Sequence, residues 1–259
     1  MTDSEPAHLT RLDRLAPGLN AFTCSFDPTL LGPIQASYLR ELAPYFARHR
    51  SLLNGGRVYR QPAGRQYYLF SYDADPLFWL SSDTAESFAL YRAFFDALGL
   101  DSDLKQLLDF QRQIVMYAGF LVIGDRSLKP IWHYDYLPQA HAYTLITPLF
   151  ELDPDHGHLL YEQGEQEALY HYRPGEAIVF GEGFLHATEP YAPTETIRVL
   201  LSLTFGTDNL DHWPILSQAV KAQSRYYVLP CGHVAGRCLC RIRHRLSTAG
   251  ASQKNRRNS

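Results

Sequence analysis

The sequence predicts an α+β protein in which a mainly helical N-terminal part supports an antiparallel β core. One observation is the segment 84–98, where Phe88, Tyr91, Phe94 and Phe95 recur at helical spacing. A second is the change of pattern after about residue 110, where short apolar runs alternate with turns that contain Pro, Gly and Asp. Many short strands at this spacing are typical of a sandwich or a barrel.

Local signals place the individual elements. Thr84 is a suitable N-cap for the helix 84–98, and Gly99 ends it. We expect an earlier helix over 35–48, a strand over 67–72 and a late helix over 212–223. The core strands are expected at 111–122, 131–134, 142–150, 158–163, 168–172, 177–180 and 196–205.

The chain is long enough to bury one sizeable core. It has 259 residues, of which 46% are hydrophobic and 20% charged, a composition that excludes disorder of the whole chain. We expect one domain with a helical support rather than two independent domains. Its parts are a flexible leader at 1–18, a mainly helical support at 19–110, the β core at 111–210, a C-terminal helix with a basic, cysteine-containing segment at 211–246, and a disordered tail at 247–259.

Charge is distributed unevenly along the chain. After Asp211 there are nine Lys and Arg residues and no acid, whereas the preceding part has 15 positive against 27 negative charges, a balance of −12. The sequence has no apolar run long enough to cross a bilayer and no signal-peptide core, so we expect a cytoplasmic protein without a membrane partner. In that compartment the four cysteines would be reduced thiols or metal ligands.

Three residues form a candidate metal site. His133 and Asp135 are two positions apart on a predicted strand, so their side chains would point the same way. His186 follows the predicted strand 177–180 and a Gly-rich turn. Two imidazoles and one carboxylate suit non-heme iron(II), because one face of the metal stays open. Taken alone, a His-x-Asp triplet is more often structural, so the pattern needs support from its surroundings.

The region from Gln113 to Gly206 resembles the core of the iron(II)- and 2-oxoglutarate-dependent oxygenases, and is similar to their prolyl-hydroxylase-like members. The segments that carry the resemblance are QIVMY at 113–117, WHYDY at 132–136, TPLF at 147–150, GHLLY at 157–161, YRPGEAIVFGEGFLHATEP at 172–190 and RVLLSLTF at 198–205. The resemblance implies that 111–210 is an oxygenase core with a double-stranded β-helix (jelly-roll) fold.

The resemblance also implies the ligands and the reaction. His133, Asp135 and His186 would bind iron(II), and Arg198 would pair with the far carboxylate of 2-oxoglutarate. Tyr117 would bind the same cosubstrate, although it could equally be a core tyrosine. The expected reaction uses O2 to hydroxylate an unactivated C–H bond of a small molecule or an amino-acid residue, with release of succinate and carbon dioxide.

One departure and two alternatives accompany this prediction. Several relatives have Ser or Thr where this chain has Leu200, and Ser202, the next residue on that face, could replace it as a cosubstrate contact. The main alternative is a cupin-like metal-binding or sensor protein of the same fold without 2-oxoglutarate turnover, against which the position of Arg198 argues. The carboxylate of Asp135 argues against a halogenase. Substrate identity is not predicted, because specificity would lie in loops such as 59–66 and 136–141.

The C-terminal segment offers a second candidate metal site. Cys, His, Cys and Cys side chains are an acceptable zinc ligand set, although the short C-x-H and C-x-C spacings would crowd one ion; the residues are Cys231, His233, Cys238 and Cys240. The alternative is that these cysteines are reduced and pack as small hydrophobic residues, as we expect for Cys24.

The basic C-terminal charges and the remaining histidines are two further groups of polar residues with a possible function. The basic charges of the segment could bind an anionic or macromolecular partner, or merely solvate the chain end; the absence of interleaved aromatics beyond Tyr227 argues against nucleic acid. The remaining histidines near the core are expected to be structural or surface residues: His141, His156, His158 and His171.

Overall fold

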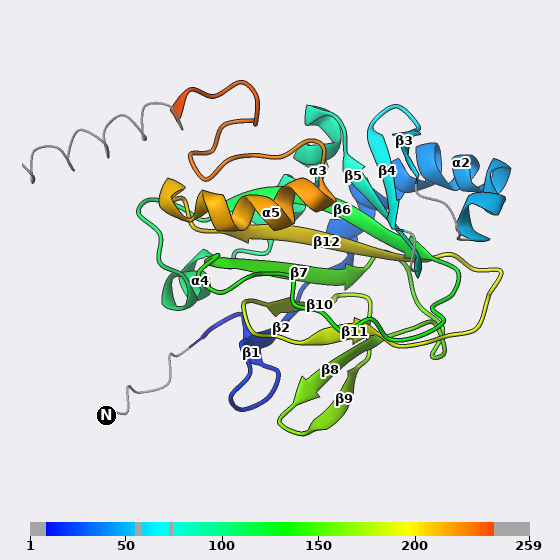
Figure 1. The fold of residues 1–259 in the computed structure, drawn as a ribbon, viewed down its shortest axis with the longest axis horizontal. Helices are drawn as coiled ribbons and strands as arrows, with labels where there is room; N and C mark the ends of the chain where they lie inside the picture. The colour runs from blue at the N-terminus through cyan, green and yellow to red at the C-terminus, as the bar shows by residue number, and fades with distance from the viewer. Residues whose placement is uncertain (1–8, 55–58, 73–74, 241–259) are drawn as a thin grey trace, which may run out of the picture.

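The computed structural model describes residues 9–54, 59–72 and 75–240, and most of its strands form one large antiparallel sheet (Figure 1). This sheet has nine strands in the order β1-β2-β10-β7-β12-β6-β5-β4-β3. Their bounds are β1 Asp13–Arg14, β2 Ala21–Ser25, β3 Arg60–Ala63, β4 Tyr67–Tyr72, β5 Asp75–Ser82, β6 Val115–Gly124, β7 Ala142–Pro148, β10 Glu176–Phe180 and β12 Arg198–Gly206. A second sheet has three strands in the order β11-β8-β9, with bounds β8 Leu159–Gln163, β9 Gln166–Tyr170 and β11 His186–Thr188.

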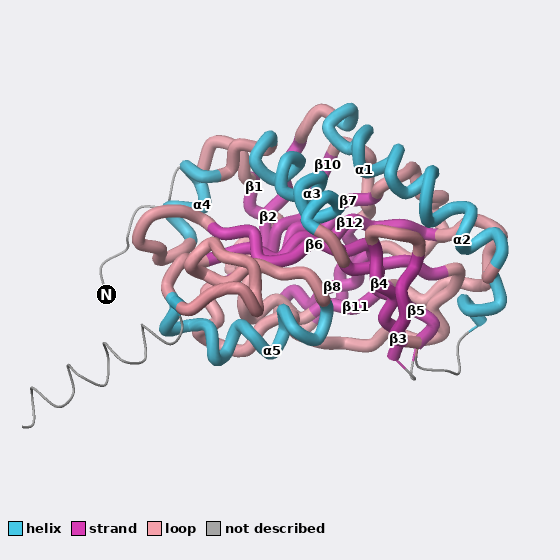
Figure 2. The backbone as a smooth tube through the Cα atoms, turned by 90° about the horizontal axis from the view of Figure 1, so that it is seen from above, coloured by secondary structure: helices cyan, strands magenta, loops and turns pink. Residues whose placement is uncertain are grey.

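Helices cover both faces of the large sheet. The α-helices are α1 Gly32–Ser37, α2 Ala43–Arg48, α3 Ala85–Ala97, α4 Asp101–Leu107 and α5 Trp213–Gln223. Figure 2 shows α1, α2 and α3 on one side of the strands and α5 on the other. The mixed fold with a large antiparallel sheet agrees with the α+β class predicted from the sequence.

The central strand β12 shows how the core is divided between the two faces. All nine of its residues are buried. Side chains alternate along a strand, so Leu201 and Leu203 pack in the cluster formed with the helices α1 to α3. Leu200 points the other way and packs with residues of the small sheet such as Leu159. The space between the two sheets is therefore reached by every second residue of β12.

Several sequence predictions are confirmed at the level of single elements. Strand β4 has the predicted bounds. Helix α3 begins after Thr84, whose hydroxyl accepts a hydrogen bond from the backbone of Ser87 at 3.3 Å. The predicted helix 35–48 is present as α1 and α2, joined by the π-helical turn Tyr38–Leu42.

Two predicted strands differ from the structure. Strand β6 begins at Val115 rather than at residue 111, because the backbone N–H groups of Gln111 and Arg112 donate to the carboxylate of Asp208 at 2.6 and 2.7 Å instead of to a neighbouring strand. The segment 131–134 is not a strand. Only His133 pairs there, in an isolated bridge with His186.

The support segment 19–110 also contributes β2, β3, β4 and β5 to the large sheet, in addition to its helices. Part of the expected leader is attached to the rest of the protein: the buried carboxylate of Asp103 accepts hydrogen bonds from the backbone N–H groups of Thr10, Arg11 and Leu12. Residues 1–8 of the leader and the expected disordered tail 247–259 lie outside the described residues. Within the described ranges, no helix combines the length and the apolar character needed to cross a membrane.

Candidate active site

The three residues of the predicted triad come together between the two sheets. His133 and His186 exchange two backbone hydrogen bonds, of 3.0 and 3.1 Å. Asp135 Oδ1 lies 3.6 Å from Nε2 of His133 and 3.7 Å from Nε2 of His186. One donor atom from each residue lies within 4.8 Å of the other two, so a single ion could contact all three.

Both imidazoles are oriented by backbone carbonyl groups. Nδ1 of His133 lies 2.8 Å from the carbonyl oxygen of Ile131, and Nδ1 of His186 lies 3.1 Å from that of Phe184. A carbonyl oxygen only accepts, so in each neutral ring the proton resides on Nδ1. The lone pair of Nε2 is thereby left on the side that faces Asp135, as a metal ligand requires.

The two carboxylate oxygens of Asp135 make different contacts. Its Oδ2 accepts a hydrogen bond from Thr144 Oγ1 at 2.6 Å, and that hydroxyl group also contacts Tyr136 Oη at 2.8 Å. Its Oδ1 is the oxygen that faces the histidines. Strand β7, through Thr144, thus fixes the carboxylate in the orientation that leaves one oxygen available for a metal.

Electrostatics keep the triad ready to bind a cation. Burial works to raise the pKa of Asp135, but His133, His186 and Thr144 outweigh it and hold that pKa below its ordinary value. Burial lowers the pKa of His186. For His133 burial also acts to lower the pKa, but Asp135 and the Ile131 carbonyl raise it above its ordinary value. An anionic oxygen and a deeply buried neutral imidazole are the forms that ligate metals.

A cavity of about 80 Å³ lies beside the triad and is lined by alternate residues of β12. Arg198, Leu200 and Ser202 are two positions apart and point into it together. Arg198 and Ser202 therefore lie on the same face of β12, beside the triad. The remaining wall is largely apolar or aromatic and includes Trp79, Phe120, Val122, Ile146, Leu159 and Tyr172.

Arg198 is a buried cation with unsatisfied hydrogen-bond donors. It is 1% exposed, and its Nε and Nη1 atoms have no hydrogen-bond partner. Leaving a buried charged group without a partner costs several kcal/mol, on the order of 3–5. A carboxylate suits these donors because it accepts two parallel hydrogen bonds from a guanidinium. The residues present therefore suit a ligand with one carboxylate at Arg198 and metal-chelating oxygens at the triad.

The structure does not bring Tyr117 to this cavity. The pairing of β6 with β12 shifts in register at Thr204 and Phe205, so Tyr117 is an additional residue of a β-bulge. Its hydroxyl group donates to the carbonyl oxygen of Thr207, and its ring packs with Trp213 and Leu216 of α5. Tyr117 therefore has the structural role that was the alternative in the sequence.

Tyr172 is the cavity tyrosine that sequence reasoning missed. It lies in the lining, and the guanidinium carbon of Arg198 is 5.8 Å from the centre of its ring. Burial raises the pKa of Tyr172, so the hydroxyl group stays protonated. The buried His158 orients Tyr172, because Nδ1 of His158 accepts a hydrogen bond from the backbone N–H of Tyr172 at 3.1 Å. The available signal was the position of Tyr172 directly before the Arg-Pro-Gly turn.

A larger cavity of about 410 Å³ meets the first one at Asp135, which lines both. Helix α5 forms one wall through Ile215, Leu216, Gln218 and Ala219. The opposite wall is the loop after the triad, with Tyr134, Tyr136, Leu137, Pro138 and Ala140, and Gly183 completes the lining. Asp135 is the one charged side chain in the lining, so this space suits an uncharged or apolar group.

The remaining candidates lie away from the triad. Among the histidines, His156 and His158 are buried, and the ring of His141 is tilted by 51° against that of His212, with ring centres 4.0 Å apart. Cys24 is buried in the core cluster of the large sheet. A second group of side chains that could hold a metal ion, separate from the triad, is formed by Cys231, His233, Cys238 and Cys240.

No protein-family model matches the chain, and no curated protein matches it. Several solved structures do match. A prolyl-4-hydroxylase from Pseudomonas putida is 17% identical, with 73% of this chain and 94% of that chain covered and a TM-score of 0.45. EctD from S. alaskensis with bound Fe is 14% identical, with 76% and 84% covered and a TM-score of 0.49. The non-heme alpha ketoglutarate dependent epimerase SnoN from nogalamycin biosynthesis is 15% identical, with 70% and 84% covered and a TM-score of 0.41.

All three TM-scores are below 0.5, so these similarities assign no function to this chain.

Proposed function

We propose that the protein is an iron(II)- and 2-oxoglutarate-dependent oxygenase with a double-stranded β-helix core, and that it acts as a hydroxylase. The observation that carries the proposal is the buried Arg198, whose unpaired Nε and Nη1 atoms share a cavity with His133, Asp135 and His186. A metal site alone needs no buried cation beside it. A ligand that chelates a metal at one end and carries a carboxylate at the other would account for both the triad and the buried Arg198. 2-Oxoglutarate is such a ligand.

Each residue would have a defined task in this reaction. Nε2 of His133, Nε2 of His186 and Oδ1 of Asp135 would hold the iron. Arg198 would bind the distal carboxylate of 2-oxoglutarate and so set its direction in the cavity. The Tyr172 hydroxyl group would add a hydrogen bond beside Arg198, and Ser202, which lines the same cavity, would contact the same ligand. When bound, the iron supplies O2 activation coupled to conversion of 2-oxoglutarate to succinate and carbon dioxide.

The second cavity is where we place the substrate. It begins at Asp135 and has an apolar lining, so the substrate is expected to present an uncharged or apolar group, from a small molecule or an amino-acid residue, to the iron. The exposed side chains of Tyr134 and Leu137 line the same cavity and extend its apolar surface outward. The wall formed by α5 would shield the reacting C–H bond from water.

An anionic or macromolecular partner for the basic C-terminal segment remains a separate proposal. Two cations of the described part are already engaged: Arg225 pairs with Asp83 at 3.0 Å, and Lys221 lies 5.9 Å from the ring centre of Trp213. Six of the nine positive charges lie beyond residue 240, outside the described residues. Docking through this segment would therefore depend mainly on those six charges.

The test has two stages. Anaerobic protein loaded with iron(II) should develop a weak visible charge-transfer band when 2-oxoglutarate is added, because the keto acid chelates the metal. After O2 is admitted, succinate should form in amounts that depend on both iron and 2-oxoglutarate, and a substrate screen by mass spectrometry should find a product heavier by one oxygen atom. Absence of the band in folded, iron-loaded protein contradicts the proposal. A band without succinate formation would favour the alternative of a cupin-like binding or sensor protein.

A further inference from the structure

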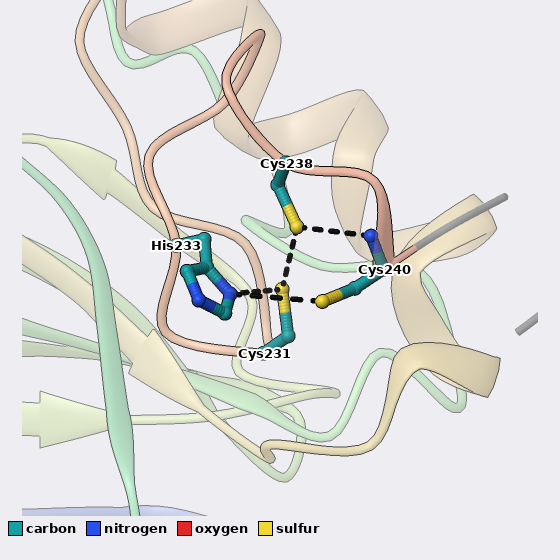
Figure 3. Close-up of side chains that lie close together, drawn as sticks. All are labelled: Cys231, His233, Cys238 and Cys240. Atoms are coloured by element: carbon teal, nitrogen blue, oxygen red, sulfur yellow. Dashed lines mark hydrogen bonds between the residues drawn. The ribbon is translucent and has the colours of Figure 1, made fainter. Parts of the chain in front are cut away.

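The described C-terminal segment folds into a compact loop whose side chains gather three thiols and one imidazole. Figure 3 shows Cys231, His233, Cys238 and Cys240 pointing toward one another. Sγ of Cys231 lies 3.5 Å from Sγ of Cys238 and 3.5 Å from Nδ1 of His233, and Sγ of Cys240 lies 3.7 Å from that same nitrogen. All four ligand atoms lie within 4.8 Å of one another.

We propose that this cluster is a structural zinc site, independent of the proposed iron site and of the proposed oxygenase function. A tetrahedral zinc site has Zn–S distances of about 2.3 Å and Zn–N distances of about 2.0 Å, so neighbouring sulfurs lie about 3.8 Å apart and a sulfur and a nitrogen about 3.5 Å apart. The three distances given above are within about 0.3 Å of these values. Four protein ligands leave no open position, which is the arrangement of a structural rather than a catalytic zinc.

The backbone of the loop explains how such short spacings can surround one ion. Val228 and Val234 form a bridge, and Leu229 donates to the carbonyl oxygen of His233 at 2.8 Å, so the chain reverses between them. Two glycines with positive φ, Gly232 at 78° and Gly236 at 82°, make the turns that direct Cys231 and Cys238 toward each other. Cys231 and His233 lie within this reversal, and Cys238 and Cys240 follow it, so the two pairs meet from different stretches of the loop.

A second feature favours thiolates at this site. The backbone N–H of Cys240 donates to Sγ of Cys238 at 3.2 Å. Such a hydrogen bond stabilises a metal-bound thiolate and is typical of the surroundings of metal ligands. Three thiolates and a neutral imidazole around Zn²⁺ carry a net charge of −1, and the adjoining sequence has Arg237 and Arg241 and no acid after Asp211. Part of the basic character of this segment would then compensate the charge of the zinc site.

The position of the loop suggests what the zinc would stabilise. The side chains of Cys231 and Cys238 pack against the cluster that contains Trp213, Leu216 and Val220 of α5. The loop is also attached to β6, where the backbone N–H of Val228 donates to the carbonyl oxygen of Tyr117 at 2.7 Å. Helix α5 forms one wall of the 410 Å³ cavity, so the zinc would fasten that wall to the large sheet.

The experiment uses the full-length protein purified under reducing, chelator-free conditions. Elemental analysis should find about one tightly bound zinc per chain, as expected for a site with four protein ligands. Because the triad could also capture zinc, the measurement is repeated with Asp135→Ala, which should retain the same equivalent. Cobalt substitution should give a thiolate-to-cobalt charge-transfer absorption, which the triad cannot produce because it contains no sulfur.

Variants and thiol chemistry complete the test. Zinc should be lost in Cys238→Ser, retained in the matched control Cys24→Ala, and retained in His233→Cys, which offers a fourth thiolate. In the unmodified protein the three thiols of the cluster should resist alkylation until a chelator is added, a measurement that does not depend on any variant folding. Less than about a tenth of an equivalent of zinc, iron in its place, or a disulfide between Cys231 and Cys238 would overturn the proposal. None of these outcomes bears on turnover of 2-oxoglutarate.

Discussion

The ring of Tyr172 lies against the guanidinium group of Arg198, whose Cζ is 5.8 Å from the ring centre, and both side chains are buried. Tyr172 arrives from the loop after β9, and Arg198 begins β12. The two residues meet only because the small sheet packs against the large one. We therefore expect Tyr172 to help define how a carboxylate binds at Arg198.

Replacing Tyr172 with Phe should weaken 2-oxoglutarate binding by about 0.5–1.5 kcal/mol, because one hydrogen bond to the ligand is lost while the ring remains. The matched control is Tyr117→Phe, which should leave 2-oxoglutarate affinity unchanged and reduce stability instead, since its hydroxyl group donates to Thr207. Titration of the anaerobic iron-loaded variants with 2-oxoglutarate, followed by the visible band, measures the affinity of each variant. Equal effects of the two variants would restore a cosubstrate role for Tyr117.

The Arg198→Ala variant should lose 2-oxoglutarate affinity by on the order of 3–5 kcal/mol, because a buried charged pair loses one partner. Iron affinity should stay within a few-fold, since Arg198 is not one of the proposed metal ligands. Arg198→Lys should recover part of the loss through charge but not the two parallel hydrogen bonds. Calorimetric titration of 2-oxoglutarate and of iron(II) would separate the two ligands. A comparable loss of both would contradict the proposed role of Arg198.

Thr144 positions Asp135, so replacing Thr144 should weaken metal binding. In Thr144→Val the side chain keeps its shape but no longer donates to Asp135 Oδ2, so iron(II) affinity should fall about 10- to 100-fold. Thr147→Val on the same strand is the control, because Thr147 donates to the backbone of Glu176 and not to the triad. Metal affinity measured by competition with a chelating dye provides the comparison. An unchanged affinity in Thr144→Val would mean that Asp135 is held by other contacts.

Helix α5 should control access of the substrate without affecting the cosubstrate. Ala219→Trp adds bulk to the wall of the 410 Å³ cavity, so hydroxylation of a substrate found by screening should fall at least about 10-fold while the 2-oxoglutarate band persists. Uncoupled formation of succinate should continue. Ala222→Trp, at a position of α5 that does not line this cavity, serves as the control. Loss of the 2-oxoglutarate band in Ala219→Trp would show that the two cavities are not functionally separate.

The order of the motifs in the sequence was enough to predict that His133, Asp135, His186 and Arg198 lie close together. Arg198 and Ser202 share one face of β12, so alternation brings that pair together. His133 and Asp135 also come together, although 131–134 is not a strand and only His133 forms a bridge, with His186. Tyr117 could not be placed in this way, because the bulge at Thr204 and Phe205 breaks the alternation and no local signal marks it.

Long-range contacts determined most of what sequence analysis missed. The segment 59–66 was predicted as a loop, but it contains strand β3, which tolerates Pro62 because it lies at the edge of the large sheet, where the missing N–H is not needed for pairing. The four proposed zinc ligands of the C-terminal loop have short spacings in the sequence that predicted crowding around one ion. Their arrangement depends on the bridge between Val228 and Val234 and on packing against α5, neither of which the ligand spacing reveals.

Asp103 should be a large contributor to stability, although it is remote from the active site. Its fully buried carboxylate accepts hydrogen bonds from the backbone N–H groups of Thr10, Arg11 and Leu12, and from the Thr10 hydroxyl group at 2.8 Å. Burial acts to raise the pKa of Asp103, but these hydrogen bonds outweigh it and hold the pKa below its ordinary value.

The sign of the pH dependence follows from that lowered pKa. A carboxylate with a depressed folded-state pKa contributes its full stabilisation above the unfolded-state value of about 3.9, and loses it as the pH falls through the folded-state value. Asp103→Asn should therefore lower the free energy of unfolding by about 1.5–3 kcal/mol at neutral pH, since an amide cannot replace the charged acceptor. The difference from the unmodified protein should shrink near pH 3.

Urea unfolding at neutral pH and at pH 3 measures this difference in the free energy of unfolding. The control is the exposed Asp101→Asn on the same helix, which should change stability by no more than about 0.5 kcal/mol. A difference that stays constant down to pH 3 would mean that Asp103 acts through packing and not through its charge.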